Sequence, residues 1–343
     1  MTNEILTRLK DLIAIDSPTG FTKAAADYVF SALKEMGLSP VYTNKGGVFC
    51  TLTSGESPLL LSAHLDTLGG IVANVKSNGR LKIAPLGGLG LPNVESENCR
   101  IYTYDGKVYT GTFQFVNPSI HVNHDYRTTE RTYDNMEVVL DEITDSKEET
   151  TALGIETGCF VCFEPRLTIT ESGYIKSRFL DDKLSAAIVL AFAKQVVSGE
   201  VVPSRSITLH FSVFEEVGHG GSASVPADTV ETLCIDMGCV GDGLSCTERE
   251  VSICVKDAHG PYHYEMTRAL VLLAKELGLR YAADVYPFYS SDANMALTAG
   301  HDIRHALIGP GVYASHGYER SHIDGAVNTL ALIGAYAKRP VNA

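Results

Sequence analysis

The chain has 343 residues, of which 45% are hydrophobic and 20% are charged, and its formal net charge is −13. This length and composition exclude a disordered or fibrous protein and allow one large domain or two. The negative charge disfavours partners that require a basic surface, so we expect neither nucleic acids nor anionic membranes as partners.

Two amphipathic helices and one buried strand are predicted in the first 70 residues. Apolar residues at helical spacing indicate a helix at the N-terminus and a second helix between Gly20 and Gly37. The segment PLLLSAHLDTLG then describes a buried strand whose C-terminal end delivers polar side chains to a cleft. No apolar stretch approaches the roughly 20 residues of a membrane span, so we expect a soluble, cytoplasmic protein.

A small all-β domain is predicted for residues 71–164. Short alternating strands are separated there by Gly, Asn and Asp turns, and helical periodicity is limited to SKEETTALG. Cys159 and Cys162 have the spacing of a zinc knuckle. Because the chain has no second CxxC pair, we expect them to be buried thiols on a strand.

An α/β pattern returns from residue 165 and continues to the C-terminus. The expected strands are SITLHFSVFEE and TLCIDMG, and the expected helices are SAAIVLAFAKQVV, HYEMTRALVLLAKELG and VNTLALIGAYAKR. We therefore predict a discontinuous α/β catalytic domain made of residues 1–70 and 165–343, with the β domain inserted between its two parts.

Acidic and histidine side chains gather where these strands end or helices begin. They are His64, Asp66, Asp181, Asp182, Glu215, Glu216 and Asp236. A lone histidine is usually a core residue, an Asp pair before a helix usually caps it, and adjacent glutamates are usually solvated. Glu215 and Glu216 do not fit that explanation, because they end a run that should be buried, where an unpaired carboxylate is costly.

As a set, these residues have the composition of a hydrolytic centre with two metal ions. Histidine and carboxylate ligands suit zinc, with cobalt or manganese as alternatives, and a set without cysteine is not a structural thiolate site. Two ions require a bridging carboxylate between terminal ligands. A further carboxylate must stay unligated, so that it can accept a proton from water.

Five segments, in their order and spacing, resemble metallopeptidase family 42, which includes glutamyl, deblocking and tetrahedral aminopeptidases. They are AHLDTLGGIVANV, GYIKSRFLDDKLSAA, FSVFEEVG, CIDMG and SSDANMA. The similarity extends to the opening IDSPTGFT and to the inserted β domain, so it covers nearly the whole chain. It implies a helix-flanked mixed-sheet peptidase fold with a barrel-like insertion, and a metallo-aminopeptidase that acts on short peptides.

The resemblance also implies a role for each residue of the site. The implied metal ligands are His64, Asp181, Glu216 and Asp236. Asp181 would bridge the two ions, and its peptide bond to Asp182 is commonly cis in similar enzymes. Glu215 would be the general base. The carboxylate of Asp66 would orient the imidazole of His64.

The last ligand is a choice between two histidines. The family shows Tyr-x-His-Ser with a Glu four residues after the His, whereas here Tyr313-Ala314-Ser315-His316 is followed by Glu319 after three. His316 fits better after one residue of slippage, and His322 is the competitor. Asp292 in SSDANMA matches an acidic position beside the family's active site, and a helix N-cap explains it equally well.

Three functions follow from these observations. The first is a dinuclear aminopeptidase. The second is a metal-dependent amidohydrolase acting on an N-acylated or modified dipeptide-like molecule, because the altered segment HGYERSH is expected to line the cleft. The third is a degenerate homologue used for binding or assembly, which predicts an eroded ligand, and the sequence shows none. The resemblance further implies a homo-oligomer based on dimers, such as a tetrahedral dodecamer, with the β domain serving oligomerisation or substrate access.

Overall fold

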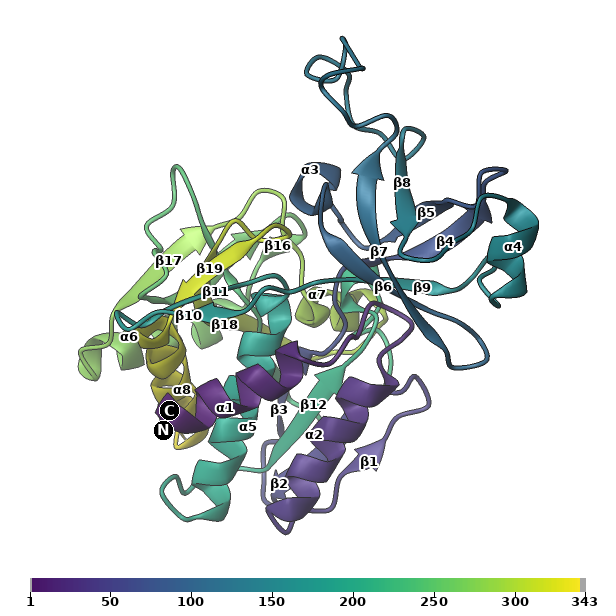
Figure 1. Cartoon of the computed structure of the whole chain (residues 1–343). Helices are drawn as coiled ribbons and strands as arrows, with labels where there is room; N and C mark the ends of the chain where they lie inside the picture. Colours follow the sequence, from purple (N-terminus) through teal and green to yellow (C-terminus); the bar gives the residue numbers. More distant parts are fainter. Residues whose placement is uncertain (1, 340–343) are drawn as a thin grey trace. The chain divides into compact units, whose positions relative to one another are not determined.

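The structure is a computed structural model that describes residues 2–339 of the chain (Figure 1). Two compact units are present: unit 1 comprises Met1–Thr67 and Arg166–Ala343, and unit 2 comprises Leu68–Pro165. The sequence places the corresponding boundaries at 70/71 and 164/165. A role of unit 2 in oligomerisation or substrate access stays a prediction.

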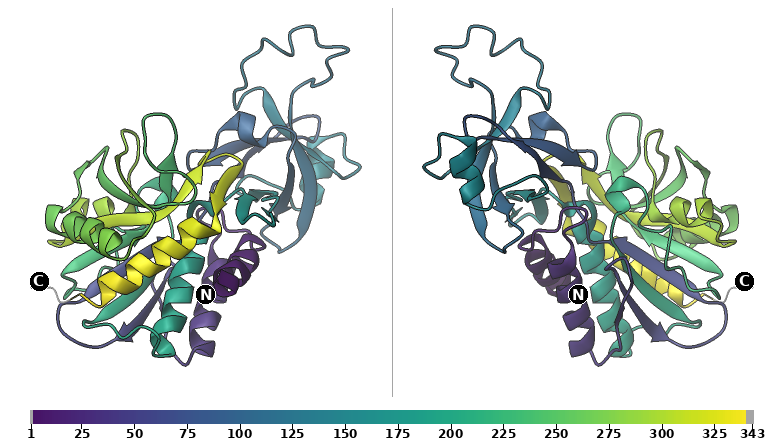
Figure 2. Two further views of the ribbon diagram at one scale, coloured as in Figure 1. Left: turned by 90° about the vertical axis from the view of Figure 1, so that its left-hand side faces the viewer. Right: turned by 90° about the vertical axis from the view of Figure 1, so that its right-hand side faces the viewer.

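The longer helices of unit 1 lie where periodicity predicts them. The helices of this unit are α1 (Thr2–Ile13), α2 (Lys23–Glu35), α5 (Leu180–Val197), α6 (Tyr264–Glu276), α7 (Asp292–Thr298) and α8 (Ile323–Ala337), with the 3-10 turn η1 (Glu215–Val217). The shorter α7 and η1 were not predicted from periodicity. Helix α5 is buried along most of its length, and α1 and α8 pack against it (Figure 2). Within residues 2–339, no helix is long and apolar enough to cross a membrane.

Unit 1 is built on one mixed sheet. Its strands are β1 (Val41–Tyr42), β2 (Val48–Thr53), β3 (Leu59–His64), β10 (Thr168–Ile169), β11 (Tyr174–Ser177), β12 (Ile207–Ser212), β13 (Glu231–Ile235), β14 (Gly238–Val240), β15 (Val251–Asp257), β16 (Gly260–Pro261), β17 (Tyr281–Val285), β18 (Arg304–Tyr313) and β19 (Glu319–His322). The main path runs β1-β2-β12-β3-β13-β18-β19-β11-β10, and β14 and β15 pair with β18.

The centre of this sheet positions the site. Strands β12, β3, β13 and β18 are neighbours and run parallel. All six residues of β3 are buried, as expected for a strand covered on both faces. The carboxyl ends of parallel strands share one edge of the sheet, so the residues that follow β3, β12 and β13 converge there.

Unit 2 is the predicted all-β domain. Its strands are β4 (Gly69–Val75), β5 (Leu81–Leu86), β6 (Asn98–Tyr102), β7 (Val108–Phe115), β8 (Met136–Leu140) and β9 (Phe160–Phe163), with the short helices α3 (Leu91–Val94) and α4 (Lys147–Ala152). The strands close into a barrel in the order β4-β5-β8-β7-β6-β9, which gives each strand two partners. Helix α4 was expected and has a capping box between Ser146 and Glu149, whereas α3 was not expected. Cys159 and Cys162 are buried at and in β9.

Candidate metal centre

His64, at the end of β3, lies at the centre of the acidic cluster. Its side chain is only 2% exposed. Nδ1 lies 2.9 Å from the carbonyl oxygen of Asp66, and Nε2 lies 3.0 Å from Oδ1 of Asp181. A proton on Nδ1 would satisfy the carbonyl and leave the lone pair of Nε2 directed into the cluster, which is the arrangement of a metal-binding histidine.

The carboxylate of Asp66 holds the chain that carries the two glutamates. It accepts hydrogen bonds from the hydroxyl of Thr19 at 2.7 Å and from the backbone N–H groups of Glu215 at 3.1 Å and Glu216 at 3.3 Å. Its Oδ1 lies 3.6 Å from Nδ1 of His64, farther than the Asp66 carbonyl oxygen. Asp66 therefore orients His64 mainly through its backbone. Its carboxylate positions η1, a role that the sequence did not indicate.

Asp181 stands between two histidines at the start of α5. Its Oδ1 faces Nε2 of His64 at 3.0 Å, and its Oδ2 lies 3.5 Å from Nε2 of His316. The peptide bond from Asp181 to Asp182 is cis, as the resemblance implies. The side chain of Asp182 accepts the backbone N–H of His64 at 3.2 Å. The first residues of α5 are thus tied to the end of β3.

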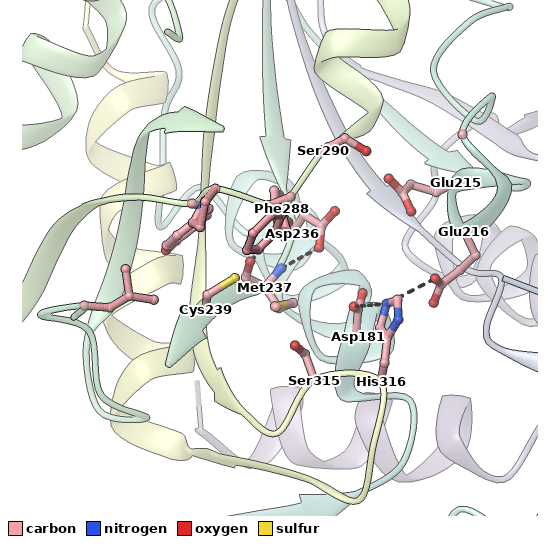
Figure 3. A pocket seen from close by; sticks show the side chains of 15 residues that line it. Asp181, Glu215, Glu216, Asp236, Met237, Cys239, Phe288, Ser290, Ser315 and His316 are labelled. Carbon is pink, nitrogen blue, oxygen red and sulfur yellow. Dashed lines mark hydrogen bonds and ion pairs between the residues drawn. The ribbon is translucent and has the colours of Figure 1, made fainter. Parts of the chain in front are cut away.

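Glu215 and Glu216 are adjacent in η1 but approach different histidines. Phe214, with φ 68°, turns the chain after β12. Oε2 of Glu215 then lies 3.9 Å from Nε2 of His64, and Oε2 of Glu216 lies 3.4 Å from Nε2 of His316. Figure 3 shows both carboxylates facing the same cavity. Two neighbouring glutamates can therefore serve different chemical roles.

The structure brings His316 to the cluster and places His322 elsewhere. Nε2 of His322 lies 2.8 Å from the carbonyl oxygen of Ser172, and its Nδ1 accepts the backbone N–H of Asp324 at 3.0 Å. Both ring nitrogens are therefore engaged, and His322 caps α8 through Nδ1. The geometry thus favours His316 as the candidate ligand, as the Tyr-to-His spacing indicated.

Glu319 links two parts of the centre. In the sequence it stood out only because it follows His316 by three residues, where the family has four. Oε1 accepts the backbone N–H of His316 at 3.0 Å, and Oε2 accepts that of Asp181 at 3.1 Å. The carboxylate is buried at 2% exposure. It fixes two candidate ligands through their backbones.

Asp236 follows β13 and completes the cluster. Its Oδ1 accepts the backbone N–H of Met237 at 2.6 Å. Ligand atoms of His64, Asp182 and Asp236 lie within 4.8 Å of one another, as do those of His64, Asp181 and Glu216. The sequence did not single out Asp182 as a ligand. Its position next to Asp181 was the only sequence feature that could have suggested it.

The chemistry of the donor set fits divalent cations. Burial and the charge of Asp181 raise the pKa of Asp236 to about 7 and that of Glu319 to about 8. The pKa of Asp181 is low despite burial, because His316 and His64 hydrogen-bond its carboxylate. Oε1 of Glu216 is buried without a hydrogen-bond partner among the described residues. Crowded, buried carboxylates of this kind are stabilised in the charged form by bound cations.

Asp292 is not the N-cap that the sequence offered as one explanation, and its position beside the cluster stays the other. The N-cap of α7 is Ser291, which forms a capping box with Asn294, so the N-cap explanation of Asp292 is wrong. The buried Asp292 carboxylate accepts hydrogen bonds from the Ser212 hydroxyl and, at 2.6 Å, from the backbone N–H of Gly221. It therefore ties the loop after η1 to the end of β12.

The cluster lines a cavity of about 470 Å³. Asp181, Glu215, Glu216, Asp236 and His316 contribute to its wall, and Figure 3 shows their side chains directed into it. The volume is within the range of small-molecule sites. A centre of this composition, open to a cavity of this size, can bind divalent metal ions and hydrolyse a small substrate.

Comparisons with known proteins agree with this chemistry. Residues 46–332 match the M42 glutamyl aminopeptidase family. A protein of Bacillus subtilis (strain 168), YhfE, named provisionally as an aminopeptidase, is 44% identical over 97% of both chains. The glutamyl aminopeptidase of Lactococcus lactis subsp. cremoris (strain MG1363) is 23% identical over 64% of this chain and 62% of its own.

The fold agrees as well. The solved structure of the Pyrococcus horikoshii TET1 peptidase superposes with a TM-score of 0.87 at 19% identity. The match covers 98% of this chain and 100% of the TET1 chain. The fold class predicted from the sequence, a mixed α/β peptidase domain with a barrel-like insertion, is confirmed. With a family match over most of its length and a histidine–carboxylate cluster at the expected sheet edge, the chain belongs to the M42 glutamyl aminopeptidase family of metal-dependent aminopeptidases.

Proposed function

We propose that the protein is a dinuclear metal-dependent aminopeptidase that removes N-terminal residues from short peptides, with Glu215 as its general base. The observation that carries the proposal is the position of Asp181. Its two oxygens face different histidines, Oδ1 at 3.0 Å from His64 and Oδ2 at 3.5 Å from His316. A carboxylate whose two oxygens face opposite sides of the centre could be shared by two ions.

The remaining candidate ligands divide between the two sides. His64 and Asp236 would hold one ion, Glu216 and His316 would hold the other, and Asp181 would be shared. Histidine and carboxylate donors favour zinc, with cobalt or manganese as alternatives. When bound, such ions supply Lewis-acid chemistry, because they polarise a carbonyl oxygen and make water more acidic.

Among the carboxylates that line the cavity, Glu215 is the one that this division leaves for proton transfer. Its side chain is 12% exposed, and its backbone N–H is fixed by Asp66 at 3.1 Å. It would accept a proton from the attacking water and return that proton to the leaving amine. General acid–base help of this kind is typically worth about 10²–10⁴-fold in rate. The surrounding carboxylates also suit a substrate with a free, positively charged α-amine.

Replacing the base tests this assignment. Glu215→Gln preserves the size of the side chain but cannot accept the proton, so turnover should fall by about 10²–10⁴-fold while both metal equivalents remain bound. Glu216→Gln is the matched control, because it removes a proposed ligand and should lower the metal content. Metal analysis and steady-state rates are measured on both variants. Near-normal turnover of Glu215→Gln would refute its role as the base.

Peptides with free and acetylated N-termini test the reaction itself. We expect leucyl and glutamyl peptides with a free amine to be cleaved in preference to the same peptides carrying an acetyl group. Preference for the blocked peptides would replace the aminopeptidase by an amidohydrolase acting on N-acylated molecules. Mass spectrometry of the products identifies the bond that is cut.

We also propose that the chain forms a homo-oligomer. The TET1 peptidase, which shares the fold, is described as assembling into a tetrahedron or a large octahedral shell. Most soluble homo-oligomers have closed symmetry and C2 dimers are the commonest, so we propose an assembly based on dimers. Mass photometry of the purified chain should show dimers or multiples of dimers, and a monomer would refute the proposal. A cytoplasmic location stays a prediction.

A further inference from the structure

The cavity has an apolar wall in addition to its acidic cluster. The apolar lining includes Met237, Cys239, Leu244, Tyr286, Phe288 and Tyr289. In Figure 3, Met237, Cys239 and Phe288 lie across the cavity from Glu216 and His316. A molecule bound at the acidic cluster can therefore extend a side chain onto this wall.

The apolar wall is supported by the protein core. Cys239, Leu244 and Tyr289 are half-buried and pack on a core cluster made of Cys234, Cys254, Tyr262, Tyr286, Ala293 and Leu307. The hydroxyl of Tyr289 donates a hydrogen bond to the carbonyl oxygen of Met237 at 3.1 Å, so its polar end is already engaged. The part of the wall made by Cys239, Leu244 and Tyr289 therefore keeps its shape when substrate binds, whereas Phe288 is 98% exposed.

The wall offers no charge to a substrate side chain. None of the described residues that line the cavity is Lys or Arg. Two lysines of the same unit are held elsewhere: Lys45 donates to the carbonyl oxygen of Gly220 at 3.2 Å, and Lys183 donates to that of Ile15 at 2.5 Å. Burial raises the pKa of the Cys239 thiol to about 12, so this group is neutral.

The acidic residues of the cavity do not supply a partner for a cationic side chain either. Those that line it are Asp181, Glu215, Glu216 and Asp236. Each already has a part in the proposed metal centre or in proton transfer, and their remaining charge would be taken up by the α-amine of the substrate. A glutamyl or lysyl side chain would therefore lose water on this wall without gaining an ion pair, whereas an apolar side chain would gain contacts.

We propose that this wall is the subsite for the first residue of the substrate, that it selects an uncharged apolar side chain such as Leu, Met or Phe, and that Leu244 is a residue that determines this specificity. The inference rests on the proposed aminopeptidase function and deepens it. Leu244 suits the role because it is half-buried against the core cluster and lines the cavity. Its backbone N–H pairs with the carbonyl oxygen of Gly241, which places it in a local turn.

A set of peptides that differ only in the first residue tests the subsite. The full-length, metal-loaded chain is given X-Ala-Ala peptides with Leu, Met, Phe, Glu or Lys as X. We expect kcat/KM for the best apolar peptide to exceed that for Glu and Lys by about 100-fold. Equal or better cleavage of the Glu or Lys peptide would overturn the inference and leave the aminopeptidase function intact. Failure to release the first residue from any peptide would instead refute the proposed function.

A charge placed on the wall tests Leu244 directly. Leu244→Arg should raise the ratio of kcat/KM for Glu over Leu by at least about tenfold, because it provides the missing cation. Leu272→Arg is the matched control: it adds the same charge on α6, where Leu272 is 47% exposed. An equal change of the ratio in both variants would overturn the assignment of Leu244.

A second variant keeps the test decisive if Leu244→Arg fails to fold. Leu244→Ala removes apolar contact without adding charge. It should lower kcat/KM for Leu-Ala-Ala by about tenfold more than for Ala-Ala-Ala, since only the longer side chain reaches the wall. An equal loss with both peptides would show that Leu244 does not contact the first side chain and would overturn the inference.

Discussion

The two sides of the candidate metal centre are held in place by different means. His64 ends a buried central strand, is 2% exposed, and has Nδ1 engaged by the Asp66 carbonyl. His316 lies in the turn after β18, with φ 62° and a side chain that is 40% exposed. Its backbone is fixed by one buried carboxylate, that of Glu319. The sheet thus preorganises the buried His64 side, whereas the His316 side stands on a more exposed turn whose backbone is tied to the Glu319 carboxylate, and we expect the His64 side to bind metal more tightly.

Removing each histidine gives the largest expected effects and can break this comparison. His64→Ala should abolish binding on its side and lower activity by more than the roughly 10–100-fold typical of losing an outer partner of a ligand. His316→Ala should bind its metal weakly, so that excess zinc restores part of the activity. Metal content and activity are measured against added zinc. Equal loss in both variants, without recovery in either, would show that the two sides do not differ.

Asp66→Asn should have the next largest effect, because the Asp66 carboxylate holds the backbone of both Glu215 and Glu216. The carboxylate accepts three hydrogen bonds, from Thr19, Glu215 and Glu216. In asparagine, an NH2 group replaces one of the two accepting oxygens and would face an N–H or O–H donor. We therefore expect η1 to shift and metal affinity to fall by about 10–100-fold. Chelator competition measures the affinity. Thr19→Val is the control, since it removes one hydrogen bond at a cost of about 1 kcal/mol in stability and should leave metal affinity near normal.

Most of the centre could be predicted from the sequence because its residues follow recognisable strands. His64, Glu216 and Asp236 come at or just after the ends of β3, β12 and β13, where a parallel sheet must bring them to one edge. Asp181 is placed by the start of α5, and the resemblance supplied its role.

The support around these residues could not be predicted, because it depends on contacts between distant segments. Glu319 receives the N–H of Asp181, 138 positions earlier in the chain. Asp292 accepts from Ser212, 80 positions away, whereas a local pattern suggested a helix cap. Hydrogen bonds of this kind leave no periodic signal, and only the folded geometry reveals them.

Glu319→Gln should have a smaller effect, confined to the His316 side. Two backbone N–H groups point at its two oxygens, and a glutamine offers only one acceptor to them. The turn that carries His316 should become less rigid, and the affinity for one of the two ions should fall by about tenfold. Metal titration by calorimetry resolves the two sites.

His322→Asn is the matched control for Glu319→Gln. Asparagine is a good N-cap, so α8 should stay capped, and His322 lies outside the cluster. Metal binding should be unchanged. Loss of an ion in this variant, with normal binding in Glu319→Gln, would reverse the assignment of the last ligand.

A third histidine shows that burial alone does not make a metal ligand. His210 lies on β12, next to β3, is 3% exposed and stacks on Phe49 at 4.4 Å. Burial and the charge of Lys45 lower its pKa to about 3. Burial would also lower the pKa of His64, but the hydrogen bond to Asp181 and nearby carboxylate charges raise it well above its usual range.

The smallest expected effect is therefore an acid sensitivity that belongs to His210. Unfolded histidine has a pKa of about 6.5, so below that pH the unfolded chain binds a proton that the folded chain excludes. The stability contributed by neutral His210 is present above pH 6.5 and is lost as the pH falls, by about 1 kcal/mol between pH 6.5 and 5.5. In urea unfolding, His210→Leu should remove this part of the slope. His124→Leu, which replaces a fully exposed histidine, should keep it. If the slope of His210→Leu equals that of His124→Leu, protonation of His210 is not the cause, and the contrast with His64 would no longer hold.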